Sequence, residues 1–258
     1  NQEVATWIAK LSKDKKVQHA FIYRIHDTPN PERVDDLRIF LKAIGYDLGD
    51  GRNDVISSRD INKLLAETKG KPEELMIQIA TLRSMAKAIY SHKNIGHFSL
   101  AFQHYTHFTS PIRRYPDMIA HRLLAHHLNG SPISAEETAR YPRAASSSSE
   151  REVAAVEAER DSTKYKQVEY MSSKVGQTFD AVISGVTDWG LYVEEKETAA
   201  DGLVRIRTLG DDFYNYVPKS YSLVGQKTKK KFSLGDRVKI KLVSADLSTR
   251  QLDFELVR

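Results

Sequence analysis

The spacing of apolar residues changes once along this chain, near residues 175 and 176. Up to that point apolar side chains recur every three or four positions, the period of an α-helix with one buried face. Beyond it apolar and polar residues alternate, as in the runs 179–183, 238–242 and 252–256. Alternation between glycine-containing turns is typical of antiparallel strands. The sequence therefore predicts an α+β protein, mostly helical over residues 1–175 and built of strands over residues 176–258.

Several helices are expected in the first part. Asn30 can cap a helix that Gly45 ends, and Ser58 begins a second one. Pro72 opens a third helix that would run until residues 94–96. Its buried face is expected to hold Leu75, Ile79, Leu82, Met85, Ala86 and Ile89.

Two polar or extended segments separate the expected helices. Residues 21–25 have the pattern of a short extended segment. The four serines at 146–149 are expected to form a polar link, after which a long helix reaches about Lys174. In the second part, five short strands suit a small closed barrel, for which the OB-fold is the natural candidate.

The composition narrows the class of protein. Hydrophobic residues make up 40% of the 258 residues and charged residues 28%, so the chain can build a core. No run approaches the roughly 20 apolar residues of a membrane-spanning helix. The absence of cysteine excludes disulfides and zinc–thiolate sites. Residues 1–10 lack the pattern of a secretory signal, so we expect a cytoplasmic monomer with no membrane contact.

The charge is unevenly distributed. The formal net charge is +5, which weakly favours a polyanionic partner. Residues 219–231 contain five lysines and no acid. Such a run is either a solvated loop or a phosphate-binding surface, and the sequence leaves both open. The lysines that would bind are Lys227, Lys229, Lys230 and Lys231.

Residues 189–193 have the sequence Trp-Gly-Leu-Tyr-Val. In a strand, Leu191 and Val193 share one face, which leaves Tyr192 on the other face near Trp189. Two exposed aromatic rings could stack on nucleobases, each worth about 1–3 kcal/mol. Alternatively both rings belong to the core, where most Trp and Tyr side chains are largely buried.

Residues 105–122 have the sequence YTHFTSPIRRYPDMIAHR. A Ser-Pro turn is followed by Arg113 and Arg114 at the start of a helix that is expected from about Arg114 to Leu128. Adjacent guanidiniums there suit a phosphate, although a structural salt bridge is the alternative for Arg113. Tyr105 either stacks on a ligand or packs internally, and packing is slightly favoured.

This stretch and the preceding His-Phe-Ser-Leu-Ala at 97–101 closely resemble motifs of the RNB family of exoribonucleases, which includes RNase II and RNase R. Residues 21–27, Phe-Ile-Tyr-Arg-Ile-His-Asp, and the Leu-Arg-Ser-Met at 82–85 are similar to that family as well. The resemblance implies that residues 1–175 form the C-terminal part of an RNB catalytic domain.

Residues 176–258 resemble the S1 RNA-binding domain, a form of the OB-fold. The likeness rests on Gly185, on the motifs at 189–193, 201–206 and 235–238, and on Asp246 with Arg250. By position, it implies that the RNA-facing residues are Trp189, Tyr192, Arg205, Asp246 and Arg250. An RNB domain followed directly by S1 is the family's own domain order.

The family resemblance also implies an activity, the hydrolysis of single-stranded RNA from its 3′ end to nucleoside 5′-monophosphates. Arg113 matches the family's catalytic arginine, which contacts the scissile phosphate. Arg114 is expected to pair with Asp117 or with the RNA backbone. Glu159 matches a position near the RNA channel, and a charged helix face is an equally good interpretation.

The family's Mg²⁺ is held by a cluster of aspartates in the early part of the RNB domain, and that motif is not found here. The acidic groups at 35–36, 47–54 and 211–212 lack it and are interpreted as solvated surface. Seven histidines lie between His92 and His127, but His121 with His126 or His127 misses the helical spacing of a zinc site. We therefore predict no metal site in this chain, and expect His107 to orient the turn through a hydrogen bond.

Three hypotheses remain. The first is the C-terminal segment of an RNB exoribonuclease, which by itself binds RNA but does not hydrolyse it. The second is a stand-alone, non-catalytic S1-type RNA-binding protein; the missing aspartates favour it, and the uncapped helix at Asn1 opposes it. The third, a ribosome-associated S1 factor, leaves residues 105–122 without a purpose.

Overall fold

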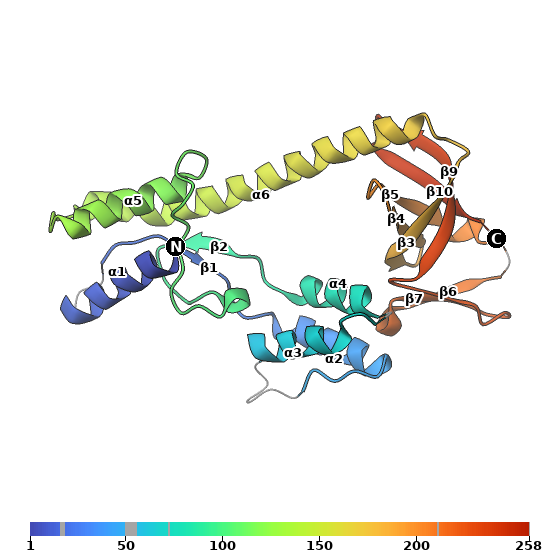
Figure 1. Ribbon diagram of the computed structural model, residues 1–258, viewed down its shortest axis with the longest axis horizontal. Helices are drawn as coiled ribbons and strands as arrows, with labels where there is room; N and C mark the ends of the chain where they lie inside the picture. Colours follow the sequence, from blue (N-terminus) through green and yellow to red (C-terminus); the bar gives the residue numbers. More distant parts are fainter. Residues whose placement is uncertain (16–18, 50–55, 72, 211, 258) are drawn as a thin grey trace. The chain divides into compact units, whose positions relative to one another are not determined.

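A computed structural model describes residues 1–15, 19–49, 56–71, 73–210 and 212–257. The chain divides into two compact units (Figure 1). The first contains Asn1–Val34, Asp50–Asn62 and Ser84–Val156, and the second contains Asp35–Gly49, Lys63–Arg83 and Glu157–Arg258. In the described part of the chain, four helices contribute residues to both units: α2 (Pro31–Ala43), α3 (Ser58–Thr68), α4 (Glu74–Ser84, through Ser84 alone in the first unit) and α6 (Ala135–Ser172).

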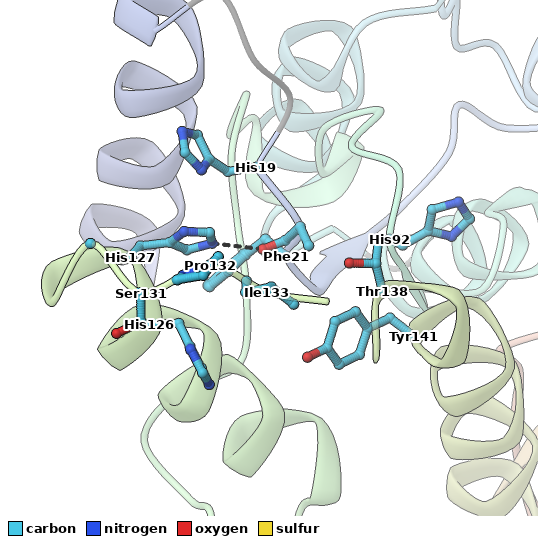
Figure 2. Close-up of a pocket in the computed structure, with 12 residues that line it drawn as sticks. His19, Phe21, His92, His126, His127, Ser131, Pro132, Ile133, Thr138 and Tyr141 are labelled. Atoms are coloured by element: carbon cyan, nitrogen blue, oxygen red, sulfur yellow. Dashed lines mark hydrogen bonds between the residues drawn. The ribbon is translucent and has the colours of Figure 1, made fainter. Parts of the chain in front are cut away.

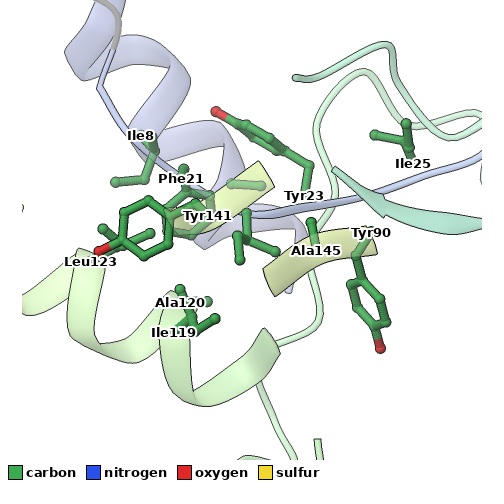
Figure 3. Close-up of a cluster of buried hydrophobic side chains, with 12 residues drawn as sticks. Ile8, Phe21, Tyr23, Ile25, Tyr90, Ile119, Ala120, Leu123, Tyr141 and Ala145 are labelled. Atoms are coloured by element: carbon green, nitrogen blue, oxygen red, sulfur yellow. The ribbon is translucent and has the colours of Figure 1, made fainter. Parts of the chain in front are cut away.

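The first unit is built around a small two-stranded sheet. Strand β1 (Tyr23–Ile25) pairs antiparallel with β2 (Ile89–Ser91). Helices α1 (Gln2–Lys15), α5 (Tyr115–Leu128) and the first part of α6 pack with these strands around one apolar cluster (Figure 3). Its most deeply buried members are Ala5, Ile8, Ile22, Ala120 and Leu123. A 3₁₀ turn, η1 (Phe98–Leu100), precedes the arginine-bearing segment.

The second unit contains a closed five-stranded barrel in the order β10-β5-β4-β3-β9. Its strands are β3 (Thr178–Thr187), β4 (Gly190–Glu195), β5 (Asp201–Arg205), β9 (Arg237–Asp246) and β10 (Gln251–Leu256). All neighbouring pairs are antiparallel except β5 with β10. Alternate residues such as Ile183, Leu191 and Ile240 fill the interior, as the period-2 pattern predicts. The predicted α+β class and the S1-type OB-fold barrel are confirmed.

Two additions complete the second unit. A separate sheet of three antiparallel strands follows η2 (Ile206–Thr208); it contains β6 (Tyr214–Val217), β7 (Ser222–Gly225) and β8 (Lys231–Ser233), with η3 (Pro218–Ser220) between β6 and β7. Helix α4 (Glu74–Ser84) lies against the barrel, where a Cβ on Gly235 would come within 3.3 Å of the Met76 Cβ. Glycine at that position allows the close approach.

The predicted third helix was wrong in its length and in its buried face. Helix α4 ends at Ser84, and residues 89–91 form β2. Its buried apolar residues are Met76, Ile77 and Ala80, whereas Leu82 is 74% exposed. Apolar residues occur on more than one side of this segment, so spacing alone could not select the face that the barrel covers. Pro72, the predicted first residue, lies outside the described residues.

The predicted break at residues 146–149 was also wrong, because α6 runs without interruption through them. The hydroxyls of Ser148 and Ser149 donate to the carbonyls of Ala144 and Ala145, four residues earlier, at 2.7 and 2.9 Å. Serines that bond back in this way are tolerated inside a helix. Tyr141 and Ala145 are buried in the apolar cluster, so tertiary packing stabilises this part of the helix.

Other expectations were met. Helix α2 has the predicted Asn30 cap, whose Oδ1 accepts the Glu32 N–H at 2.8 Å, and α5 covers the predicted segment. None of the helices in the described part of the chain is long and apolar enough to cross a lipid bilayer.

Candidate functional site

The arginine turn, residues 110–114, is held by one buried carboxylate. Asp117, in the first turn of α5, is fully buried. Its Oδ2 accepts the backbone N–H of Ser110 at 2.8 Å and the Arg114 Nη2 and Nε groups at 2.8 and 3.2 Å. The N–H groups of Arg113 and Arg114 both donate to the Ser110 carbonyl. One side chain therefore fixes both ends of the turn.

The two adjacent arginines have different surroundings. The Arg114 guanidinium is committed to Asp117 and its side chain is 20% exposed. Arg113 is exposed, and no side chain among the described residues forms a hydrogen bond or ion pair with its guanidinium. Its neighbour Ile112 is 99% exposed at the tip of the turn. The arrangement gives Arg113, rather than Arg114, a free planar donor set for an anion.

Tyr105 and Thr106 connect the arginine segment to the sheet. The Tyr105 carbonyl accepts the Arg24 N–H at 2.9 Å, and the Thr106 hydroxyl donates to the Ile22 carbonyl at 2.7 Å. The half-buried Tyr105 ring contacts the rings of His97 and His107 edge-on, at centroid distances of 5.2 and 5.8 Å. Packing is thus part of its role, and stacking on RNA stays a prediction.

Arg24, Tyr90 and Glu152 form a polar layer beneath this segment that the sequence reasoning missed. The Arg24 guanidinium pairs with Glu152 at 2.5 Å and lies 4.6 Å from the centre of the Tyr90 ring. The Tyr90 hydroxyl and His107 Nδ1 are hydrogen-bonded at 2.8 Å. An arginine in the middle of the apolar run 21–25 was the feature that could have revealed it, because a buried arginine needs a carboxylate partner.

Two imidazoles in this layer are kept neutral. Burial, reinforced by the charges of Arg114 and Arg24, lowers the pKa of His107 to about 4. Burial and the neighbouring His26 lower the pKa of His97 to about 4 as well. Burial raises the pKa of Tyr90. His107 forms its hydrogen bond with Tyr90, within the layer that supports the turn, rather than with the turn itself.

The remaining histidines are spread over several local contacts. His121 stacks on Phe108 at 3.8 Å, and His104 bonds with Asn94. His92, His126 and His127 line a cavity of 550 Å³ between α5 and α6, where His127 Nε2 is bonded to the Ala20 carbonyl (Figure 2). In the part of the chain that the structure describes, no group of three or more His, Asp or Glu side chains could hold a metal ion.

The acidic residues that the structure describes do not fit the Mg²⁺ site that the RNB resemblance implies. Asp35 pairs with Arg38 on an exposed helix face. Asp212 accepts the N–H groups of Lys227 and Thr228; although desolvation opposes the shift, these bonds lower the pKa of Asp212 to about 2. Most of the group at 47–54, and Asp211, lie outside the described residues. No step of a reaction can be assigned to a metal on these residues.

The barrel presents an aromatic face made by Trp189 and Tyr192. Trp189 is 55% exposed, and its indole N–H points to the Tyr192 hydroxyl at 3.3 Å. Two glycines shape this face. A Cβ at Gly190 would overlap the Val204 carbonyl, and a Cβ at Gly185 would lie 3.3 Å from the Tyr192 Cβ and 3.4 Å from its ring. Both rings are thus at the surface, which removes the core interpretation of Trp189.

The other predicted RNA-facing residues of the barrel already have partners in the second unit. Arg205, opposite Gly190 in the β4–β5 register, pairs with Asp253 at 3.2 Å. The Ser248 hydroxyl and the backbone of residues 248 and 249 lower the pKa of Asp246 to about 2, so its carboxylate closes the β9–β10 turn. Arg250 pairs with Asp161 of α6 at 2.7 Å. Both ion pairs, Arg205–Asp253 and Arg250–Asp161, are partly exposed, so each contributes little to stability.

The lysine run and Glu159 are both exposed. Lys227, Lys229 and Lys230 lie in the turn between β7 and β8, and Lys231 begins β8. They belong to the three-stranded sheet rather than to the barrel. Glu159 is on the surface of α6 in the second unit. The structure therefore brings Trp189, Tyr192 and Arg205 together on the barrel, whereas Arg113 lies in the first unit.

Two protein families match this chain, one over its first half and one over its C-terminal part. The family model described as RNB domain matches residues 1–130, and the model described as S1 RNA binding domain matches residues 172–256. Ribonuclease R of Aquifex aeolicus is 41% identical over 237 residues, which cover 92% of this chain and 33% of that protein. The chain spans about a third of the length of the curated relatives it matches.

Solved structures show the same fold. Mycoplasma genitalium RNase R, in a complex with ribose methylated single-stranded RNA, matches all of this chain and 40% of its own, with a TM-score of 0.87 and 31% identity. Yeast Ssd1, a pseudonuclease, matches 86% of this chain and 28% of its own, with a TM-score of 0.57 and 20% identity. At this low identity, the likeness to Ssd1 shows only a shared fold.

Proposed function

The chain belongs to the RNB-domain family of ribonucleases, and from this premise we propose that it forms the C-terminal part of an exoribonuclease that degrades single-stranded RNA in the 3′-to-5′ direction. The observation that carries the proposal is the exposed Arg113 guanidinium on a turn that Asp117 fixes from below. A turn fixed in this way holds Arg113 in a narrow range of positions, which a donor to a reacting phosphate requires.

Arg113 is proposed to bind the scissile phosphate and to offset the negative charge that grows on it during hydrolysis. The planar guanidinium can meet two phosphate oxygens at once, which a lysine cannot. Arg114 lies next to it but is engaged by Asp117, so it supports the turn electrostatically. In this proposal Arg113 is the catalytic residue, and Asp117 is a positioning residue that acts through the turn.

The barrel is proposed to hold the single strand. Trp189 and Tyr192 offer stacking surfaces that accept any base, while Arg205, Arg250 and the lysines of the β7–β8 turn meet phosphates. Asp246 orients the turn that carries Arg250. Tyr105 and Glu159 are proposed to contact RNA near the catalytic arginine in the complete protein.

Family members generally use a divalent metal ion, and the donor set described above does not supply a site for one. We therefore propose that these 258 residues bind RNA by themselves but do not hydrolyse it. The family's aspartate motif would have to lie in sequence beyond this chain. The second candidate, a non-catalytic RNA-binding protein, is favoured by the same lack of the motif.

Two RNA substrates distinguish these functions. The 258-residue chain and the full-length gene product are each incubated with single-stranded RNA, labelled at the 5′ or the 3′ end, with Mg²⁺ present. We expect the full-length product to release labelled mononucleotide from the 3′-labelled strand at once, and to shorten the 5′-labelled strand progressively. The shorter chain should bind both strands and leave them intact.

Each departure from this pattern has a defined meaning. Shortening by the 258-residue chain alone would refute its inactivity. A full-length product that binds RNA and leaves both strands intact would establish the non-catalytic function. Internal cleavage products, or release from the 5′ end, would contradict the proposed direction.

A further inference from the structure

The second unit contains a groove that the proposed RNA face does not include. It has a volume of 320 Å³ and lies at the end of the barrel where β5 and β10 finish and β9 begins. The groove is lined by η2, by the start of β9, by the end of β10 and by β8 with the residue before it. It is thus formed between the barrel and the three-stranded sheet.

The lining combines apolar and cationic groups. Leu209 and Phe232 are buried, and Val238 and Leu256 are half-buried, so the groove has an apolar base. Three exposed cations, Lys230, Arg237 and Lys239, line the same space, and no acidic residue does among the described lining residues. This pairing suits a ligand with a flat apolar part and a negative charge.

The nearest acids in the sequence and register do not form ion pairs with Arg237 or Lys239. Asp180 is opposite Lys239 in the β3–β9 register, but the two do not form an ion pair within 4 Å in the described structure. Asp236 precedes Arg237, and its carboxylate accepts the Ser233 N–H at 2.7 Å. The Lys230 ammonium lies 4.9 Å from the centre of the Phe232 ring, at the groove.

The groove is connected to the aromatic face by a short path along the chain. The Ile206 N–H donates to the Trp189 carbonyl at 2.9 Å, so η2 starts beside the backbone of Trp189, a residue that is 55% exposed. Three residues later η2 reaches the groove through Thr208 and Leu209. A nucleic-acid strand that stacks on Trp189 can therefore continue along η2 without leaving the barrel end.

We propose that this groove is a second nucleotide subsite, which takes about one nucleotide of the same single-stranded RNA. The base lies on Val238 and Leu256, and the flanking phosphates meet Arg237 and Lys239. The proposal rests on the RNA binding proposed above and adds a contact point beyond the S1 aromatic face. It predicts that affinity rises when the RNA becomes long enough to reach from Trp189 to the groove.

The test compares RNA lengths and salt. Fluorescence anisotropy measures the binding of oligouridylates of about 4 and about 12 nucleotides, within the range of OB-fold site sizes. The double variant Arg237→Gln/Lys239→Gln should bind the short RNA like the unmodified chain but lose most of the gain for the long one. Its slope of log K against log salt for the long RNA should fall by about 1.4, or 0.7 for each lost phosphate contact.

A control removes one positive charge from the same strand, to be compared with half the effect of the double variant. Lys241 lies two residues beyond Lys239 on β9 and is exposed but does not line the groove. Lys241→Gln should leave the length dependence unchanged. An equal effect of Lys241→Gln would mean that β9 acts only through its general charge and would overturn the subsite.

A crosslinking experiment locates the RNA directly. Long oligonucleotides with 4-thiouridine are irradiated on the chain, and the crosslinked peptides are identified by mass spectrometry. Crosslinks in the peptides that contain Val238 or Leu256 support the subsite. The subsite is contradicted if crosslinks occur only near Trp189 and Tyr192 and the double variant binds long RNA as tightly as the unmodified chain. That outcome leaves the proposed RNA face intact.

Failure of the proposed function has a different outcome. If the chain binds neither RNA length, both proposals fall together. If it binds RNA and the double variant has no effect, only the groove proposal fails. Retained RNA binding with crosslinks absent from the groove, together with capture of an acidic peptide by Arg237 and Lys239, would assign the groove to a protein partner instead.

Discussion

The arginine turn and the aromatic face of the barrel present their functional side chains in opposite ways. At the turn, Asp117 is fully buried and receives three N–H groups, and Arg113 extends from this fixed base. On the barrel, Trp189 is 55% exposed, and its polar contact with Tyr192 is long at 3.3 Å. One region fixes its side chain from beneath, and the other leaves its rings at the surface.

This difference matches two kinds of task. Stabilising charge on a reacting phosphate requires a donor within a narrow range of positions, because the energy is lost when the donor is displaced. Stacking on bases of any sequence tolerates sliding and rotation. The comparison predicts that changes at the turn affect turnover and stability, whereas changes on the barrel affect RNA affinity.

The largest effect is expected for Arg113→Ala in the full-length protein. Loss of a donor to the developing charge should lower turnover about 10²–10³-fold and leave the RNA dissociation constant nearly unchanged. Arg113→Lys should recover only part of the turnover, because the ammonium cannot bind two oxygens in one plane. Single-turnover rates and anisotropy titrations measure both quantities. Equal losses in rate and affinity would show that Arg113 is only a binding residue.

The next effect concerns the buried base of the turn. Asp117→Asn should lower the free energy of unfolding by about 3–5 kcal/mol, because Arg114 loses its buried charged partner. Asp35→Asn is the matched control: its ion pair with Arg38 has the same three-residue separation, but Asp35 is 65% exposed. That variant should cost about 0–1 kcal/mol. Urea unfolding followed by circular dichroism measures both, and similar losses would contradict the role of burial.

Much of the fold was predictable because local patterns and tertiary packing agree there. Alternation in β3, β9 and β10 predicted the barrel, and the Asn30 cap predicted the start of α2. The errors arose where contacts between segments distant in the sequence determine the structure. The face of α4 is set by the barrel against Met76, and the course of α6 through its serines is stabilised by Tyr141 and Ala145 in the core.

The candidate site was predictable in its residue types but not in its arrangement. The sequence placed two arginines side by side, yet only the burial of Asp117 separates the engaged Arg114 from the exposed Arg113. Trp189 lies in the turn between β3 and β4, where the alternation of a strand does not decide which way its side chain faces. The groove beside β9 was invisible in the sequence, because Lys230, Arg237 and Leu256 meet only in three dimensions.

A moderate effect is expected on the barrel. Trp189→Ala should weaken binding of single-stranded RNA by about 1–3 kcal/mol, whatever its sequence, and Tyr192→Ala should act similarly. Phe213→Ala is the matched control, since Phe213 is 73% exposed in the same unit but lies outside the aromatic face. Anisotropy titrations with oligouridylate and oligoadenylate measure the change. An equal loss in Phe213→Ala would indicate a non-specific aromatic effect.

The last prediction concerns the pH dependence of the free energy of unfolding, which should differ between the two regions. The pKa of His107 is lowered to about 4 in the folded chain, so the unfolded chain binds more protons between about pH 6.5 and pH 4. Stability should therefore fall as the pH decreases through this window, by roughly 1–3 kcal/mol for this group. The lowered pKa values of Asp212 and Asp246 in the second unit affect stability only below about pH 4.

Urea unfolding at pH 7 and pH 5 should show a loss of stability that His107→Gln reduces, because glutamine keeps a partner for Tyr90 but does not titrate. If the variant loses as much stability on acidification as the unmodified chain, the pH dependence arises elsewhere than beneath the arginine turn.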